Sequence, residues 1–185
     1  YKKKYYSVIG SILHRANKNT IVWGSGFISS DSNVKQTPIK VCAVRGPKTR
    51  EILINNGIEC PEIYGDPALL LPIIYSPKIV KKYKLGIIPH YIDKNNSWVD
   101  KLKNNDEIKI IDIQTKKPFE VIDEILSCNK IISSSLHGII VSDAYSIPNL
   151  WVEFSKNVTG NGFKFNDYFL SVGRPECSAF TIKNE

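Results

Sequence analysis

Short apolar runs rich in Ile and Val alternate along this chain with segments that show helical periodicity and helix-end residues. This alternation is typical of βαβ units, in which a helix links each strand to the next parallel strand. The apolar runs do not alternate strictly with polar residues, which favours parallel sheets covered by helices on both faces. We therefore predict an α/β fold with doubly wound sheets.

The second half of the chain shows the clearer series of elements. Strands are predicted over residues 85–88, 108–113, 130–133 and 149–152, and helices over residues 97–103, 118–128, 136–145 and 165–172. In the first half, strands are predicted over residues 6–9, 20–23, 41–44 and 62–64. A helix is expected from Pro47 to Ile54, because Pro favours the first helical position and Gly57 follows the last. We expect a partial N-terminal Rossmann-like domain over residues 1–75, a linker over 76–84 and a C-terminal Rossmann-like domain over 85–185.

The charge balance narrows the classes of partner. The chain has 185 residues, of which 42% are hydrophobic and 23% are charged, as in an ordinary globular protein. Its formal net charge of +7 favours an anionic partner such as nucleic acid, a membrane face or a phosphorylated small substrate. We expect no nucleic acid partner, because no arginine–aromatic patch, zinc-finger spacing or RNA-binding aromatic signature is present.

The cysteines and histidines give no sign of a metal. Cys42, Cys60, Cys128 and Cys177 stand alone, which fits reduced thiols in the cytoplasm rather than a zinc knuckle or redox dithiol. The three histidines lie far apart, without the spacing of a metal site. No apolar stretch approaches the roughly 20 residues of a membrane span. Because the chain contains no Met, even at position 1, we expect it to be a fragment.

The most informative segment covers residues 131–140. A buried strand is followed by Ser133, Ser134 and Ser135, and then by His137 in the first turn of an apolar helix. The N–H groups and dipole of a helix N-terminus favour anions, and a histidine can transfer a proton near neutral pH. The alternative is that a serine caps a core helix and the histidine is incidental.

Other polar residues also follow predicted strands. In open α/β sheets, ligands bind beyond the carboxyl ends of the strands, where His90, Asp112 and Glu153 are expected together with the serines. Each has another explanation: His90 as a surface loop residue, Asp112 as a helix cap and Glu153 as a solvated charge. Their common position at one edge favours a ligand site.

The first domain has glycine-containing turns after its strands. Gly24 and Ser25 follow one strand, Arg45 another and Asp66 a third. An arginine at a strand end, beside Gly46, suits bidentate binding of a carboxylate or phosphate. The alternative for Arg45 is a salt bridge to the following helix. No P-loop, no Gly-x-Gly-x-x-Gly and no Gly-x-Ser-x-Gly motif is present, which argues against a P-loop hydrolase, a dinucleotide enzyme and a serine hydrolase.

Six segments in this order resemble the polysaccharide pyruvyl transferase family. They are residues 21–27 (IVWGSGF), 44–47 (VRGP), 64–68 (YGDPA), 87–91 (IIPHY), 133–138 (SSSLHG) and 144–148 (AYSIP). The resemblance covers about residues 6–155 and implies a two-domain, glycosyltransferase-B-like fold with its site in the interdomain cleft. It also implies transfer of an enolpyruvyl group from phosphoenolpyruvate, forming a pyruvate ketal on a sugar of a bacterial surface polysaccharide or its lipid-linked precursor. Phosphoenolpyruvate is then a co-substrate, and no other cofactor is expected.

The resemblance assigns donor binding to Arg45 and His137. Together with the physical argument, it places the donor phosphate at Ser134, Ser135 and the amides of Leu136 to Gly138, and the donor carboxylate at Arg45. His137 would then transfer one of the two protons. Further contacts to the substrates are expected from Gly24, Ser25, Asp66, His90 and Glu153.

The resemblance also has consequences beyond the donor. Family members carry residues before the equivalent of Tyr6, so we expect the N-terminal domain to be incomplete. A lipid-linked acceptor and the surplus of lysines suggest peripheral contact with the inner face of the cell membrane. Two alternatives remain: a nucleotide-sugar glycosyltransferase, with the diphosphate at the serines and the ribose at Glu153, and a truncated, non-catalytic module that binds an anionic glycan or a lipid-linked sugar.

Overall fold

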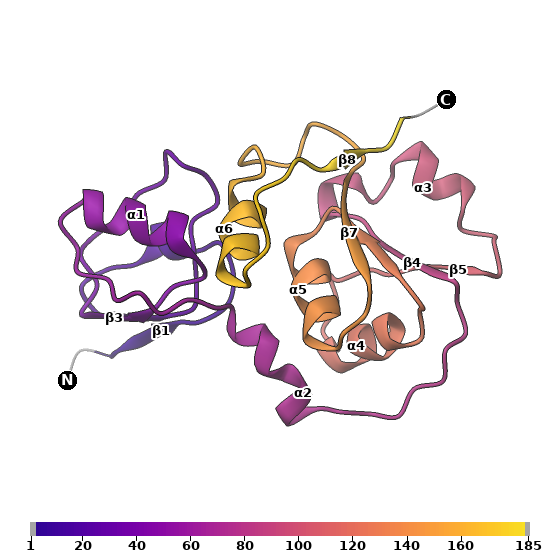
Figure 1. The fold of residues 1–185 in the computed structure, drawn as a ribbon, viewed down its shortest axis with the longest axis horizontal. Coiled ribbons are helices and arrows are strands. Elements are labelled where there is room, and N and C mark those ends of the chain that lie inside the picture. Colours follow the sequence, from indigo (N-terminus) through magenta and orange to yellow (C-terminus); the bar gives the residue numbers. More distant parts are fainter. Residues whose placement is uncertain (1–2, 184–185) are drawn as a thin grey trace. The chain divides into compact units, whose positions relative to one another are not determined.

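The computed structural model describes residues 3–183, which form two compact units (Figure 1). Unit 1 contains the residues up to Pro67 and the later segment Thr159–Ser178. Unit 2 contains Ala68–Val158 and the residues from Ala179 onward. No helix in this part of the chain is both long and apolar enough to span a bilayer.

Unit 1 is built on a parallel sheet with the strand order β1-β2-β3. Its elements are β1 (Tyr5–Ser7), the 3-10 helix η1 (Leu13–Arg15), β2 (Thr20–Trp23), β3 (Lys40–Ala43), α1 (Pro47–Asn55) and α6 (Phe163–Ser171). Its core joins Leu13 of η1, Val22 of β2, Leu53 of α1 and Phe163 of α6. The described helices of unit 1 therefore cover one face of the sheet.

The other face of this sheet is more exposed. Tyr6 and Trp23 are 69% and 45% exposed, whereas their neighbours Ser7 and Val22 are buried. Successive side chains of a strand point to opposite faces, so Tyr6 and Trp23 lie on the face away from the core. Helices on this second face, which a doubly wound sheet requires, are not among the described elements of unit 1.

Unit 2 contains five parallel strands in the order β5-β4-β6-β7-β8. Its strands are β4 (Leu85–Ile88), β5 (Ile108–Ile110), β6 (Ile131–Ser133), β7 (Asn149–Glu153) and β8 (Phe180–Thr181), and its longer helices are α3 (Ser97–Lys101), α4 (Pro118–Leu126) and α5 (Leu136–Ala144). Ile87 packs with Val99 of α3, whereas the next residue, Ile88, packs with Ile125 of α4. Unit 2 thus has helices on both faces, as Figure 1 shows.

Three short elements complete the fold. They are η2 (Pro67–Leu70), α2 (Leu71–Ile74) and η3 (Tyr91–Asp93). The chain after α2 runs without regular structure to β4, and it is attached to unit 2 by hydrogen bonds from the N–H groups of Lys82 and Tyr83 to the Ser127 carbonyl.

The division into units differs from the expected domains 1–75 and 85–185 and the expected linker 76–84. The break falls at Pro67, and residues 76–84 belong to unit 2. Residues 159–178 return to unit 1, because Phe163 enters its core and Asp167 forms an ion pair with Arg45. These contacts link residues more than a hundred positions apart, which local patterns do not reveal.

The predicted elements agree with the structure more closely. The strands at 20–23 and 85–88 have the predicted bounds, and α1 starts at Pro47 as expected. The strand predicted over 108–113 ends at Ile110, and the one predicted over 62–64 is only an isolated bridge between Tyr64 and Val44. β8 was not predicted, because its two residues are exposed and form no apolar run.

Candidate active site

The strand order of unit 2 creates a topological switch point. Its first strand, β4, lies between its second, β5, and its third, β6. The helix after β4 (α3) and the helix after β6 (α5) lie on opposite faces of the sheet, which opens a crevice at the carboxyl ends of β4 and β6 where ligands bind in sheets of this order. The loops at this crevice carry His90 and the segment Ser134–His137.

A hydrogen bond joins these two loops directly. The His90 N–H donates to Ser134 Oγ over 2.7 Å, and the Ser134 N–H donates to the Ile88 carbonyl over 3.1 Å. The Ser134 hydroxyl in turn donates to Asp93 Oδ2 over 3.3 Å. A second hydroxyl, that of Ser155, donates to Asp93 Oδ1. Because Asp93 is only 3% exposed, this carboxylate holds three loops in a buried network.

Sequence reasoning missed Asp93. It lies in η3, five residues after the end of β4, beyond the short stretch read as a strand-end loop. The signal in the sequence that could have identified Asp93 is its position three residues after His90 in the same strand-end loop.

The first serine of the run has a structural role. Ser133 Oγ lies 3.1 Å from the Ile88 carbonyl and 2.8 Å from the Ser135 carbonyl, and it accepts a hydrogen bond from the Ser135 N–H. A Cβ on Gly138 would lie 2.4 Å from this hydroxyl and 3.0 Å from Ile88 Cδ1. Gly138 is therefore needed for the close packing of α5 on the sheet.

The next residues begin α5. Ser135 occupies the N-cap position with extended backbone, and its side chain does not cap the helix. The N–H groups in the first turn of a helix have no acceptor within that helix, and the dipole makes this end positive. Leu136 is 4% exposed, so its side chain belongs to the core. Because the Ser135 side chain makes no capping hydrogen bond, the alternative of a serine side-chain cap on α5 is wrong.

His137, in the first turn of α5, lines a cavity of about 360 Å³ in unit 2. The other lining residues are mostly apolar: Leu71, Ile74, Ile113, Thr115, Pro118, Phe119, Val121, Ile122, Ile125 and Val141. His137 thus contributes a polar group to a largely apolar wall.

Glu153 and Asp112 lie at the ends of other strands. Glu153 is half-buried at the end of β7, where its carbonyl accepts from the Ile182 N–H over 2.9 Å. Asp112 forms an ion pair with Lys94 over 2.6 Å and accepts from the Gln114 N–H. Burial raises the pKa of Asp112, but the hydrogen bonds from Lys94 and Gln114 outweigh it and lower the pKa below its usual value.

The candidates of unit 1 lie together, and all are buried. Ser25 is 0% and Asp66 is 2% exposed, and the Ser25 hydroxyl hydrogen-bonds Ser7 over 2.7 Å. Gly24 has a φ of +101°, and a Cβ on it would lie 2.2 Å from Pro67 Cδ. The loops after β2 and after Tyr64 therefore pack tightly against each other.

Arg45 bonds protein groups on all three of its nitrogens. Nε donates to Asp167 over 2.9 Å, Nη1 to Ser11 Oγ over 2.7 Å and Nη2 to the Phe27 carbonyl over 2.6 Å. Burial lowers the pKa of Arg45, whereas Asp167 and Asp66 act in the opposite direction. The side chain is 0% exposed, so it is not placed as the open clamp that the sequence suggested.

The expected ligand path beside Gly46 is occupied by protein. A Cβ on Gly46 would lie 1.8 Å from the Asp167 carbonyl oxygen, so the small residue admits helix α6. The ion pair is with α6 and not with the following helix, α1, which was the alternative weighed from the sequence.

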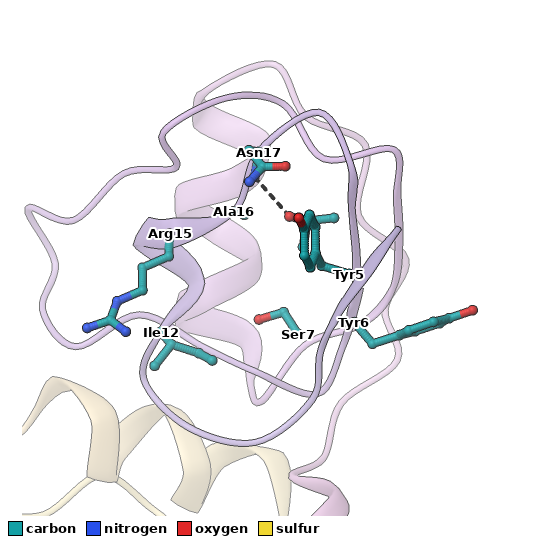
Figure 2. Close-up of a pocket in the computed structure, with 8 residues that line it drawn as sticks. Tyr5, Tyr6, Ser7, Ile12, Arg15, Ala16 and Asn17 are labelled. Carbon is teal, nitrogen blue, oxygen red and sulfur yellow. Dashed lines mark hydrogen bonds between the residues drawn. The ribbon is translucent and has the colours of Figure 1, made fainter. Parts of the chain in front are cut away.

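A further hollow of unit 1 lies beside the edge strand β1 (Figure 2). Its volume is about 260 Å³, and Tyr5, Arg15 and Asn17 contribute to its wall. None of the site residues predicted from the sequence lines it. Among residues 3–183, no three His, Cys, Asp or Glu side chains gather in a way that could hold a metal ion.

Comparison with known proteins agrees with these motifs. The sequence model of the polysaccharide pyruvyl transferase family matches residues 1–155. An uncharacterised protein of Acanthamoeba polyphaga mimivirus is 35% identical over 181 residues, covering 91% of this chain and 60% of the relative. The succinoglycan biosynthesis protein ExoV of Rhizobium meliloti is 28% identical over 175 residues, covering 89% of this chain and 52% of the relative.

The chain thus spans between half and two thirds of the length of these relatives. No solved structure matches it. The family match covers most of the chain and includes the strand-end loops of both units. The chain belongs to the polysaccharide pyruvyl transferase family.

Proposed function

We propose that this chain binds phosphoenolpyruvate at the switch point of unit 2 and takes part in forming a pyruvate ketal on a sugar of a surface polysaccharide or its lipid-linked precursor. The observation that carries this proposal is the 2.7 Å hydrogen bond between the His90 N–H and Ser134 Oγ, which joins the two loops of the switch point. The family membership and the relative named for succinoglycan biosynthesis support the reaction class.

The donor phosphate binds at the N-terminus of α5. The first-turn N–H groups point out of the helix there, and the Ser135 hydroxyl is not used as a cap. Ser134 acts differently: its hydroxyl is engaged with His90 and Asp93, so it positions the turn and does not bind phosphate itself. Arg45 likewise positions the strand ends of unit 1 through Asp167, Ser11 and Phe27.

His137 transfers a proton during the addition step. A sugar oxygen bonds to C2 of phosphoenolpyruvate while a proton reaches the methylene carbon, which becomes a methyl group. A second hydroxyl then displaces inorganic phosphate from C2 and closes the ketal. His137 either protonates the methylene or takes the proton of the first hydroxyl. His90 and Glu153 contact the acceptor.

A membrane contact fits a lipid-linked acceptor. Ile73, Ile74 and Val80 are 82%, 74% and 74% exposed, in a stretch that also contains exposed lysines. No Asp or Glu occurs between Asp66 and Asp93. Exposed apolar side chains beside lysines suit the anionic face of a bilayer. We place the membrane-facing surface on residues 73–82.

Calorimetric titration of the donor tests the proposed function. We expect phosphoenolpyruvate to bind the chain and nucleotide sugars not to bind, with phosphate release once a suitable sugar is supplied. The matched variant Ser135→Val fills the N-cap with an apolar side chain and should weaken donor binding. Preferential binding of a nucleotide sugar would contradict the proposal and favour a glycosyltransferase.

A further inference from the structure

Lys164 is a buried cation in unit 1. It lies in the first turn of α6 and is only 7% exposed. Lysine is almost never this buried unless it is paired, because an ammonium loses its hydration and must regain the interaction elsewhere. Sequence reasoning gave this residue no role, since one lysine among many reads as a solvated charge.

No anionic partner accounts for this burial. The Lys164 ammonium lies over the Phe165 ring, 5.6 Å from its centroid, and among residues 3–183 no ion pair or hydrogen bond joins it. Asp167 lies one helical turn later, but its carboxylate already accepts from Arg45 and from the N–H and hydroxyl of Thr49. The nearby carboxylate is therefore committed to other donors.

The surrounding charges make the local field more positive. Burial, and then the like charge of Arg45, lower the pKa of Lys164 to about 8. The N-terminus of α6 adds partial positive charge, so a lysine in the first turn is placed against the helix dipole. Asp66 lies close enough to raise the pKa of Arg45, but it is not among the groups that shift that of Lys164.

We propose that unit 1 carries an oxyanion site in which Lys164 binds a phosphate or carboxylate group. An anion there would supply the counter-charge that the protein itself does not provide, at the carboxyl end of the unit 1 sheet where Arg45 also lies. The oxyanion is either a phosphate of the acceptor or a free small anion bound by unit 1. This inference goes beyond the proposed function, because it concerns unit 1 and does not depend on donor binding in unit 2.

The test compares Lys164→Met with Lys164→Arg in the whole chain, using thermal unfolding and calorimetry with inorganic phosphate, pyruvate and phosphoenolpyruvate. Without these anions, Lys164→Met should unfold at a higher temperature than the wild type, because an unpaired buried charge is gone. With phosphate, the wild type and Lys164→Arg should be stabilised more than Lys164→Met, which keeps only the binding proposed at the N-terminus of α5. Loss of a charge-assisted hydrogen bond should weaken binding about tenfold or more.

Lys40→Met is the matched control, because Lys40 is an exposed lysine of the same unit. It should change neither the unfolding temperature nor phosphate binding. Lys164→Gln serves as a second variant with a polar but uncharged side chain. If Lys164→Met loses affinity for phosphate but not for pyruvate, the site takes a phosphate group, and the reverse assigns it to a carboxylate.

Equal phosphate binding by the wild type, Lys164→Met and Lys164→Gln would overturn the inference, as would the absence of any anion binding by the wild type. Equal binding would leave the proposed donor site at α5 untouched, whereas the absence of any anion binding would also contradict donor binding in unit 2. If the wild type forms no ketal but binds phosphate more tightly than Lys164→Met does, the oxyanion site is still supported.

Discussion

The Nε atom of Arg45 lies 2.9 Å from Oδ2 of Asp167, and both side chains are fully buried. The two residues are 122 positions apart, yet this pair attaches helix α6 to the strand ends of unit 1. Thr49 completes the arrangement by donating its N–H and its hydroxyl to the same carboxylate. The Arg45 guanidinium is therefore a part of the fold of unit 1.

Replacing Asp167 by Ala should destabilise the chain by about 3–5 kcal/mol, because it leaves a buried guanidinium without its counter-charge. Urea unfolding followed by circular dichroism measures the loss. The control is Lys48→Ala, which breaks the exposed pair with Glu176 and should cost about 1 kcal/mol or less. A similar loss of unfolding free energy in both variants would contradict the prediction that the buried pair contributes more to stability than the exposed pair.

Replacing Gly138 by Ala should cost about 1–3 kcal/mol through overpacking, because the new Cβ would meet Ser133 Oγ at 2.4 Å. The comparison is Gly57→Ala, where a Cβ meets nothing within 4 Å but φ is +71°. That variant isolates backbone strain, which we expect to cost about 1–2 kcal/mol. Gly138→Ala should also weaken phosphoenolpyruvate binding, and Gly57→Ala should leave it unchanged.

Replacing His137 by Ala should slow phosphate release from phosphoenolpyruvate by about 10²–10⁴-fold, the usual contribution of a positioned acid or base. The matched control is His14→Ala, since His14 is an exposed histidine of unit 1. Near wild-type turnover by His137→Ala would remove this residue from the proton transfer.

Replacing Asp93 by Asn should raise the KM for phosphoenolpyruvate about tenfold while changing kcat less. The substitution removes one acceptor from the network that holds the His90 and Ser134 loops together. Ser155→Ala deletes only the outer hydroxyl and should have a smaller effect. A larger effect on kcat than on KM would instead place Asp93 in the chemical step.

Replacing Lys78 and Lys82 by Gln should weaken binding to vesicles containing anionic lipid by about fivefold per lysine. Lys81 and Lys84 are left in place, because they bond the Cys128 carbonyl and Glu107. The double variant Lys35→Gln/Lys40→Gln is the control on another surface. Co-sedimentation that is equal for neutral and anionic vesicles would contradict the membrane contact.

The apolar control uses the exposed residues of the same segment. Ile73→Ser/Ile74→Ser should reduce the binding that remains at high salt, because it removes apolar surface and no charge. Ile63→Ser alters a 57% exposed residue of unit 1 and should leave sedimentation unchanged.

Local patterns predicted the elements that depend on neighbouring residues. The apolar runs placed β2 and β4 with the observed bounds, and Pro47 and Gly57 marked the ends of the first helix. The segment Ser133–His137 was predicted as the junction of a strand and a helix, which the structure confirms. The six motifs led to the family, which the family model confirms over residues 1–155.

Long-range contacts decided which of the candidates face one another. In the sequence, Arg45 read as an open clamp, but packing of α6 buried it against Asp167. Asp93 became part of the site only because the fold brings its carboxylate to Ser134 and Ser155. Each of these outcomes depends on a partner distant in the sequence.

The sequence by itself determined the α/β class, most strands and helices, and the family, because periodicity and short motifs act over a few residues. Only the tertiary structure decided that residues 159–178 return to unit 1, that β4 lies between β5 and β6, and that Lys164 is buried. These features follow from the packing of apolar surfaces across the whole chain. That packing also determines which charged side chains lose their water and therefore need a partner.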